Sequence, residues 1–394
     1  MRTLNTLRWM PLMLTYLMIS PALFPAMAWP GFDWDTWRDV TKVEKPALDT
    51  PQAGLAELLP LLASVGPDSP RMHTHQAWQA KQARVRQTLE ALLGQPTSLV
   101  SVPASAEVLG EEDMGDYIRR HVRIASSADD AIPAYILIPK NLGDAPAPVM
   151  LVLHQTQAPG KQEAVGMTGN PEMAFGPELV ARGFICVAPD VIGFGERIPD
   201  GAQPYANALD FYRRHPQWSF FGKMAWDVQR IVDYIETMPE ADASRIGSIG
   251  HSHGAYGTIM ATIFEPRIKA SVASCGFTTL RTDPAPNRWS HLTALMPRLG
   301  FYVDDVKEAP LDWHEILACI APRPFFNWAT LEDDIFPNTA NLEDVYAQVH
   351  EVYALYDKPG DFQGRLGPGA HAFPKEIREE AYDWLEAQLN KKEE

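Results

Sequence analysis

The sequence predicts an α/β protein with a mostly parallel central sheet and helices on both of its faces. Short continuous apolar runs, such as residues 149–153 and 184–188, alternate with helical patterns through most of the chain. Such runs are typical of parallel strands that are buried on both faces and joined by crossover helices. One strand leads into Gly250-His251-Ser252-His253-Gly254, a match to the G-x-S-x-G pattern of a serine on a strand-to-helix turn.

The composition indicates a globular protein and argues against nucleic acid as a partner. The 394 residues are 46% hydrophobic and 21% charged, which is enough apolar material for a substantial core. The formal net charge is −16, whereas binding to phosphates requires clustered lysine and arginine. An odd count of three cysteines does not form a disulfide framework. We expect buried thiols, with a single disulfide between two of Cys186, Cys275 and Cys319 as the alternative.

Residues 1–28 have the character of a secretory signal peptide. Arg2 and Arg8 supply a positive end, residues 9–24 are apolar, and Ala26-Met27-Ala28 fits a small-x-small cleavage site. The apolar run is short and contains prolines, which argues against a membrane-spanning helix. We therefore expect export to the periplasm or the extracellular space, with no membrane span after cleavage. An uncleaved anchor is the alternative.

The mature chain is predicted to begin with a helical arm over residues 29–100. Its first part is rich in proline, tryptophan and aspartate, which suggests irregular structure with a short helix near residues 55–62. A stronger helical pattern covers residues 75–93, where four apolar residues share one face and Gly94 ends the helix.

Residues 101–394 are predicted to form the main α/β domain, which carries the candidate site. Two strands separated by a polar stretch come first and predict an antiparallel hairpin. Strands and helices then alternate, and function is expected at the carboxyl ends of the parallel strands. The expected strands are residues 117–124, 132–138, 149–153, 184–188, 245–249, 268–273 and 324–328. The expected helices are residues 172–182, 226–238, 255–264, 342–356 and 377–389.

Two segments, residues 193–223 and 278–313, interrupt this alternation and are rich in aromatic residues and proline. Each follows a strand, so each should lie over the carboxyl edge of the sheet and shape the substrate pocket. An ordinary surface excursion is the equally weighted alternative. The candidate pocket residues are Trp289 and His291 in the second segment and Trp226 just after the first.

Ser252 is the candidate nucleophile. Its flanking glycines fit a strained, crowded backbone, and an apolar strand and a helix stand on either side as the pattern requires. A chance match in a glycine-rich turn is the alternative. A serine hydroxyl reacts poorly at neutral pH, so a histidine must take its proton, and a carboxylate usually orients that histidine. On this kind of turn, the acid and then the histidine follow the serine in the chain.

Four histidines beyond the motif could act as the base, namely His291, His314, His350 and His371. We favour His371, because it lies in a glycine-rich loop directly before the last helix. His314 and His350 belong to helical patterns and are expected to be structural.

The acid is expected in the acidic cluster that follows the late strand 324–328. Asp333 is our choice, with Asp334 as the closest alternative and Glu332 as the third. Catalysis also needs donors aimed at the developing oxyanion. We assign these to the backbone N–H of His253, the residue after the nucleophile, and to that of Gln155, in the loop after strand 149–153.

No metal and no cofactor is expected. His251 and His253 flank the serine closely, but the turn directs their side chains apart, and no other spacing suggests a metal site. His154 precedes the nucleophile in the chain and is expected to hydrogen-bond its own loop rather than act as a base.

With these motifs the chain resembles the α/β-hydrolase superfamily, and within it the branch of exported dienelactone hydrolase-like and acetyl xylan esterase-like proteins. The resemblance covers about residues 75–390 and is carried by residues 153–156 (LHQT), 188–196 (APDVIGFGE), 222–227 (GKMAWD), 245–254 (RIGSIGHSHG) and 321–324 (APRP). It implies a serine hydrolase of carboxylic esters, with the triad Ser252, Asp333 and His371 and no cofactor. The substrate would be a small-molecule or carbohydrate ester, such as an acylated sugar.

The chain departs from that branch at two points. The oxyanion loop reads His-Gln rather than His-Gly, and dienelactone hydrolases use a cysteine nucleophile, which disfavours lactone activity. A prolyl-oligopeptidase-type peptidase is an alternative, although residues 1–140 are too short and too helical for the propeller such enzymes usually carry. A non-catalytic binding protein on a hydrolase scaffold is another, disfavoured by the complete set of serine, acid and histidine. The oligomeric state is not determined by the sequence.

Overall fold

The computed structural model describes residues 32–50, 61–62, 74–96, 102–143 and 145–391. Its strands are β1 Ala106–Asp113, β2 Tyr117–Ser127, β3 Asp130–Pro139, β4 Ala147–Leu153, β5 Ile185–Pro189, β6 Ala241–His251, β7 Ile268–Ser274, β8 Phe325–Thr330 and β9 Phe362–Gly367. Its α-helices are α1 Trp34–Thr41, α2 His75–Leu93, α3 Lys161–Ala164, α4 Phe175–Val180, α5 Ala208–Arg214, α6 Phe220–Ile235, α7 His253–Phe264, α8 Trp313–Ala318, α9 Leu342–Ala354 and α10 Lys375–Leu389.

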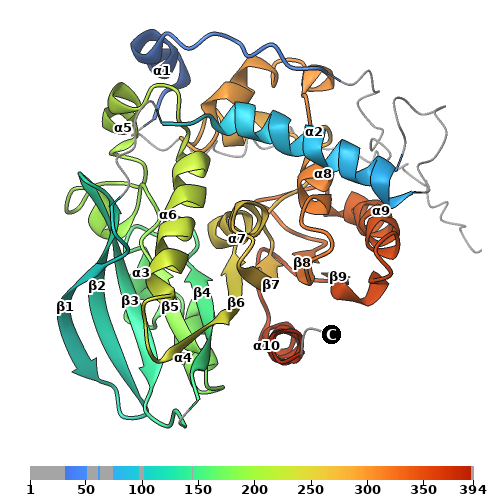
Figure 1. The fold of residues 1–394 in the computed structure, drawn as a ribbon. Helices are drawn as coiled ribbons and strands as arrows, with labels where there is room; N and C mark the ends of the chain where they lie inside the picture. The colour runs from blue at the N-terminus through green and yellow to red at the C-terminus, as the bar shows by residue number, and fades with distance from the viewer. Residues whose placement is uncertain (1–31, 51–60, 63–73, 97–101, 144, 392–394) are drawn as a thin grey trace, which may run out of the picture.

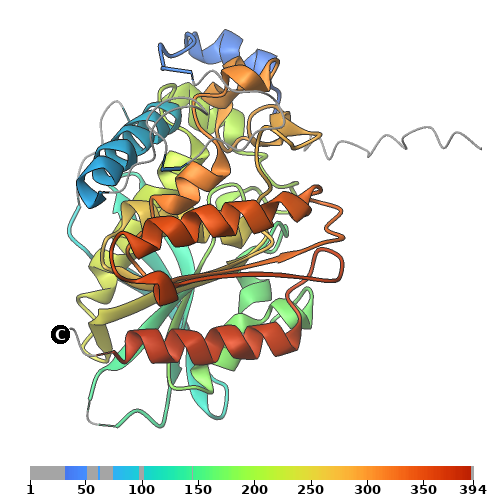
Figure 2. The same cartoon turned by 90° about the vertical axis from the view of Figure 1, so that its right-hand side faces the viewer.

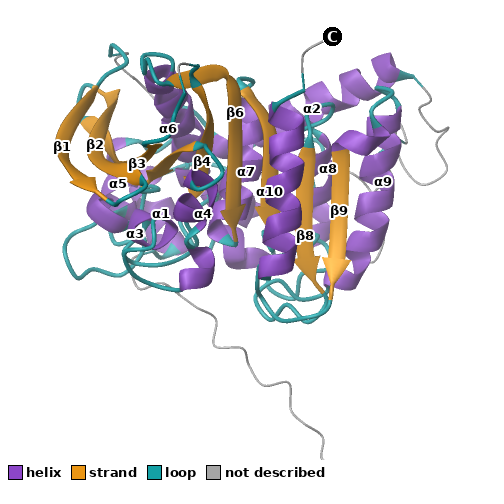
Figure 3. Cartoon of the chain, turned by 90° about the horizontal axis from the view of Figure 1, so that it is seen from below, coloured by secondary structure: helices purple, strands orange, loops and turns teal. Residues whose placement is uncertain are grey.

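Within these residues, nine strands form one sheet in the order β1-β2-β3-β5-β4-β6-β7-β8-β9 (Figures 1 and 3). The strands from β5 to β9 run parallel, whereas β1, β2 and β3 are antiparallel to their neighbours. Helices α6, α7 and α9 pack on one face, and α4 and α10 pack on the other. Figure 2 shows α9 and α10 on opposite sides of the sheet near β8 and β9. The predicted fold class is therefore confirmed.

The predicted central strands occur because they are buried on both faces. Nearly every residue of β4 and every residue of β5 and β8 is buried, as expected for strands covered by helices. Helix α6 begins earlier than expected, because Ser219 caps it by accepting a hydrogen bond from Gly222 N–H at 3.0 Å. Strands β1 and β9 and the short helices α1, α3 and α5 were not expected from the sequence.

The arm packs against the segment of residues 278–313. The Trp34 indole Nε1–H on α1 donates to Pro297 O at 2.8 Å, and Gln82 on α2 donates to the carbonyls of Cys319 and Ala321 beyond α8. Figure 1 shows α2 lying across the helical side of the molecule, away from the β1–β3 end. The helix expected near residues 55–62 falls mostly outside the described residues, as does the expected signal peptide.

The carboxyl ends of the parallel strands meet at one edge of the sheet. The β2–β3 turn also lies at this edge, because the pairing of β3 with β5 sets Ala134 opposite Pro189. Cys186, Cys275 and Cys319 are all buried and free, as expected. No helix of the described residues is long and apolar enough to cross a membrane.

Candidate active site

Ser252 lies on a strained turn between β6 and α7. Its backbone has φ 55° and ψ −117°, in the region that non-glycine residues rarely adopt. The flanking glycines are sterically required. A β-carbon on Gly250 would lie 2.3 Å from Gly254 O, and one on Gly254 would lie 2.0 Å from Leu153 O. The Ser252 side chain makes no capping bond to α7, so its hydroxyl is not committed to the helix.

The loop after β4 lies directly beside this turn. A β-carbon on Gly254 would lie 3.1 Å from His154 O, which places the peptide between His154 and Gln155 against the start of α7. The N–H of His253 belongs to the first turn of α7, where backbone donors have no partner within the helix. The structure therefore places the two peptide groups that were predicted to donate to the oxyanion next to each other.

His154 holds its own loop in place, as expected. Its Nδ1 lies 2.7 Å from Gln155 O, and its Nε2 accepts the Val191 N–H at 3.2 Å. Because a carbonyl can only accept, Nδ1 carries the proton and the ring is the neutral Nδ1–H tautomer. Complete burial lowers the pKa of His154 and keeps it neutral.

The acid and base candidates are in contact. His371 Nδ1 lies 2.8 Å from Asp333 Oδ2, and the Asp333 side chain is fully buried whereas that of His371 is 14% exposed. The other Asp333 oxygen accepts the N–H groups of Ile335 and Phe336 at 2.9 and 2.8 Å. Asp333 therefore accepts three hydrogen bonds, and it directs the Nδ1–H tautomer of His371, leaving Nε2 free to act as a base.

The carboxylates on either side of Asp333, those of Glu332 and Asp334, have different surroundings. Glu332 accepts a hydrogen bond from Gly369 N–H, and its own N–H donates to Gly369 O at 3.1 Å. These two bonds tie the acid loop after β8 to the base loop after β9. Asp334 is exposed, and no hydrogen bond of the described residues joins it to His371.

His371 also lies next to the nucleophile turn. Its ring centroid is 4.7 Å from that of His251, the residue before Ser252. The hydrogen bonds of the described residues include none between Ser252 and His371 themselves. Serine–histidine contacts are often long in substrate-free sites and tighten when the substrate binds.

Three possible metal-ligand atoms cluster here, from Cys275, Asp333 and His371, within 4.8 Å of one another. Burial and the Asp333 carboxylate raise the pKa of the Cys275 thiol to about 12, so it is protonated at neutral pH. Its Sγ lies 3.4 Å from Ala372 O, which accepts the thiol hydrogen. Asp333 accepts three hydrogen bonds, one of them from His371, and the Cys275 thiol donates one, so all three side chains are engaged in hydrogen bonds.

A cluster of aromatic side chains lies beside the site. The buried Trp289 ring stacks on Phe336 at 5.8 Å and meets Tyr256 edge-on at 5.1 Å, and Phe336 in turn lies 5.7 Å from His371. Of the predicted pocket residues, Trp289 is thus linked to His371 through the Phe336 ring. Sequence reasoning missed Tyr256 and Phe336, although Tyr256 lies one helical turn after Ser252, a spacing that could have identified it.

The other two predicted pocket residues contact the arm and the β2–β3 hairpin. His291 stacks on Trp34 of the arm at 4.4 Å, and its Nδ1 lies 2.9 Å from Ser290 Oγ. The Trp226 Nε1–H donates to Ser126 O in the β2–β3 hairpin at 3.2 Å. Each side chain binds a neighbouring segment of the fold rather than Ser252, Asp333 or His371.

The first irregular segment reaches the nucleophile turn, and the second reaches the acid loop. Phe194, from the first, lies 4.8 Å from the His253 ring. Arg288, from the second, donates to Ile335 O at 2.7 Å, which fastens that segment to the acid loop, and its ion pair with Asp283 of the same segment holds the guanidinium in place. These contacts favour the interpretation of both segments as covers of the carboxyl edge over that of surface excursions.

The parallel sheet and the serine turn define the class of fold: the chain has an α/β-hydrolase-type fold. The family described as "Glucuronyl esterase, fungi" matches residues 200–356. The chain is 25% identical over 292 residues to the hydrolase YtaP of Bacillus subtilis, covering 73% of this chain and 93% of that protein. It is 25% identical over 197 residues to 4-O-methyl-glucuronoyl methylesterase 1 of Wolfiporia cocos, covering 45% of this chain and 48% of that protein.

Solved structures agree on the fold. A glucuronoyl esterase from Solibacter usitatus superimposes with a TM-score of 0.66 at 18% identity, covering 86% of this chain and 99% of that one. A Bacteroides fragilis protein described as an acetyl xylan esterase superimposes with a TM-score of 0.59 at 17% identity, covering 79% and 83%. The expected likeness to acetyl xylan esterases is therefore confirmed at the level of fold, and glucuronoyl esterases are similar as well.

Proposed function

We propose that the protein is an exported serine esterase that cleaves carboxylic esters of carbohydrates. The observation that carries this proposal is the 2.8 Å contact of His371 Nδ1 with the buried Asp333, beside a serine held at positive φ. The similarity to glucuronoyl and acetyl xylan esterases supports the substrate class. Residues 1–28 would be removed on export, leaving the arm, residues 29–100, and the catalytic domain, residues 101–394.

The reaction proceeds in two halves. Ser252 Oγ attacks the ester carbonyl carbon while His371 Nε2 takes the hydroxyl proton, and the C–O bond to the alcohol then breaks as His371 returns the proton to the leaving oxygen. Water next attacks the acyl-enzyme, giving its proton to His371, which protonates Ser252 as the acid leaves. Asp333 stays ionised and stabilises the imidazolium at each stage.

The tetrahedral oxyanion would be held by the N–H groups of His253 and Gln155. The His253 N–H lies at the amino end of α7, where the helix dipole favours negative charge. The two peptides are fixed by the packing of Gly254 against Leu153 O, so they need no rearrangement during the reaction.

The sugar could enter as either half of the ester. In a uronic acid ester the sugar supplies the acyl group that Ser252 carries, whereas in an acetylated sugar it supplies the leaving alcohol. A panel should therefore hold methyl glucuronate, an acetylated xylo-oligosaccharide, a small activated acetyl ester and a peptide substrate. Turnover of at least one ester and none of the peptide is expected, and the reverse would favour the peptidase alternative.

The assignment of the nucleophile is tested by Ser252→Ala. We expect kcat to fall by about a thousandfold or more on every ester that the wild-type protein cleaves. Ser244→Ala, an exposed serine of β6, is the matched control and should retain wild-type turnover. An alanine variant at 252 that kept wild-type turnover would overturn the proposal.

A further inference from the structure

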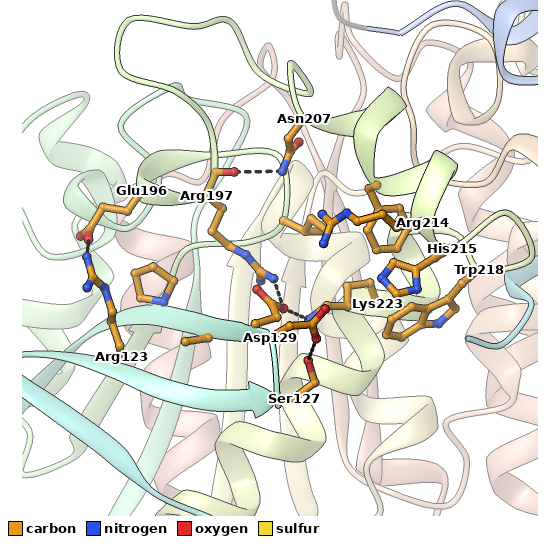
Figure 4. A pocket seen from close by; sticks show the side chains of 15 residues that line it. Arg123, Ser127, Asp129, Glu196, Arg197, Asn207, Arg214, His215, Trp218 and Lys223 are labelled. Carbon is orange, nitrogen blue, oxygen red and sulfur yellow. Dashed lines mark hydrogen bonds and ion pairs between the residues drawn. The ribbon is translucent and has the colours of Figure 1, made fainter. Parts of the chain in front are cut away.

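One buried carboxyl group near the carboxyl edge of the sheet has no cation beside it. Two other buried acids in this region are paired. Arg197, which lines the cavity shown in Figure 4, pairs with Asp227 at 2.6 Å. Lys161 in α3 pairs with Asp190 at 2.6 Å. Glu163, in the same short helix, is fully buried, and no ion pair of the described residues includes it. Burying a carboxyl group without a counter-ion costs free energy, so Glu163 must serve in some way other than a salt bridge.

The carboxyl group of Glu163 joins the loop after β4 to the segment after α3. Its Oε1 accepts the side-chain Nε2–H of Gln155 at 3.1 Å and the backbone N–H of Asn170 at 3.0 Å. Its Oε2 is buried and has no hydrogen-bond partner among the described residues, and burial raises the pKa of the group. A β-carbon on Gly169 would lie 2.6 Å from Oε1, so the chain closes tightly over this carboxyl group. Its contacts are therefore directed to Gln155 and Asn170.

Gln155 is the residue whose backbone N–H is the second proposed oxyanion donor. Its carbonyl oxygen accepts the Nδ1–H of His154 at 2.7 Å, and its side chain is held by Glu163. The start of α7 supports the preceding peptide from the side of His154 O. The chain has Gln155 where the resembling branch has glycine, and a glycine offers no side chain to hold. The direction of the Gln155 N–H therefore depends on a side-chain contact as well as on the backbone.

We propose that Glu163 is a positioning residue, which keeps the Gln155 N–H directed at the oxyanion by holding the Gln155 side chain. The inference rests on the proposed function, because only ester cleavage provides an oxyanion for that N–H to bind. Glu163 itself does not contact the reacting atoms. Its bond to Gln155 does not require a charge, because a carboxyl oxygen accepts hydrogen bonds in both the ionised and the protonated form. An uncharged amide at position 163 should therefore do the same.

Two replacements of Glu163 test this by steady-state kinetics on a small acetyl ester. Glu163→Met keeps the length of the side chain and removes the acceptor. Its kcat should fall by about ten- to a hundredfold, because a small displacement of a catalytic donor has effects of this size, whereas KM should change little. Glu163→Gln keeps an acceptor oxygen and should stay within about threefold of wild type. Equal losses in the two variants, or a loss confined to KM, would overturn the proposal.

A double-mutant cycle tests whether the two side chains act through their shared bond. Gln155→Met retains the backbone N–H and removes the other partner, so its kcat should fall about as far as that of Glu163→Met. The double variant should be no worse than either single one, and losses that multiply would show that the side chains act separately. Glu172→Met is the matched control. Glu172 is an exposed glutamate of the following segment that pairs with Arg378, so its replacement should leave kcat unchanged.

A measurement without turnover separates this inference from the proposed function. Hydrogen exchange of residues 154–160, followed by mass spectrometry, reports opening of the loop, and exchange of β8 in the same samples reports any general loss of stability. Exchange of the loop should be about tenfold faster in Glu163→Met than in wild type and unchanged in Glu163→Gln, with β8 unaffected. Loop exchange at the wild-type rate in Glu163→Met would overturn the inference. If the wild-type protein cleaves no ester, the proposed function fails, and the exchange result still decides whether Glu163 holds the loop.

Discussion

The rings of His251 and His371 are in contact, with centroids 4.7 Å apart and their planes tilted by 48°. His251 also lies 3.0 Å from Ser274 Oγ through its Nδ1. Burial, together with the neighbouring His371, holds the pKa of His251 well below 6.5. His251 is therefore an uncharged neighbour of His371, the proposed base, and does not compete with it for the charge of Asp333.

Three buried histidines of the site should make the protein sensitive to mild acid. Burial lowers the pKa of His154, His251 and His253 in the folded state. Below about pH 6.5, the unfolded chain takes up protons that the folded chain refuses, so the free energy of unfolding falls as the pH falls. We expect a slope of up to about 1.4 kcal/mol per pH unit for each such histidine, measured by urea unfolding between pH 7.5 and 5.5.

His253→Phe isolates one of these contributions. The His253 ring is fully buried and neither of its nitrogens has a hydrogen-bond partner, so phenylalanine keeps its aromatic contacts with Phe194 and Tyr256. The pH dependence of the free energy of unfolding should become shallower by the amount that corresponds to the uptake of about one proton. This should hold whatever the free energy of unfolding is at pH 7.5. The same replacement at the exposed His75 is the control, and an unchanged slope in His253→Phe would count against this account.

Replacement of Asp333 should impair the orientation of His371 without impairing the binding of substrate. In Asp333→Asn the amide can no longer hold the Nδ1–H tautomer of His371, so kcat should fall by roughly a thousandfold to ten-thousandfold. KM should change little. Asp334→Asn, which alters the exposed neighbour, should stay within about twofold of wild type. Steady-state kinetics on a small acetyl ester give both results, and a comparable loss in the two variants would reopen the choice of acid.

Gly254 should not tolerate a side chain. In Gly254→Ala the new β-carbon meets Leu153 O, so the turn must move and the proposed oxyanion donors move with it. Such overpacking costs ~1–3 kcal/mol, and kcat should drop as well. Gly110→Ala in β1 is the control, because a β-carbon there meets nothing within 4 Å. Thermal unfolding and ester turnover of both variants test this. A Gly254→Ala protein with the stability and the turnover of wild type would refute it.

The thiols should be inert in the native protein. Burial raises the pKa of Cys275 and Cys319 to about 12 and raises that of Cys186 as well. A thiolate is the reactive form, so Ellman's reagent at pH 8 should label the protein only after it unfolds, and then at all three cysteines. Rapid native labelling, or fewer than three thiols in denaturant, would contradict the free, buried state.

The sequence predicts those parts of the fold that are buried on both faces, and misses those that depend on a partner. Strand β1 is almost wholly exposed and carries no apolar pattern. Strand β9 contains glycines at 364 and 367, which usually argue against a strand. The structure explains the two glycines of β9. A β-carbon on Gly364 would lie 2.4 Å from the Tyr346 ring, and one on Gly367 would lie 2.4 Å from the Trp328 ring. Those rings come from α9 and β8, so no local pattern could indicate them.

The order of the candidate serine, acid and histidine could be proposed from the sequence because the turn and the strand ends restrict where each can stand. The separation of Asp333 from Asp334 came only with the structure, which buries one and exposes the other. Pocket residues were harder still, because a loop sequence does not specify where a side chain points. His291 illustrates this, since its ring is stacked on Trp34 from the distant arm.

Strand β9 is one of the two edge strands of the sheet and, among the described residues, pairs only with β8. The loop that carries His371 leaves this strand directly, and it is joined to the acid loop by the two bonds between Glu332 and Gly369 and by the contact of His371 with Asp333. Segments at an edge open with a smaller free energy than the core. On heating, the margin of the sheet should therefore fray while the interior strands remain folded, and the enzyme should lose its activity at a temperature below that of its cooperative unfolding.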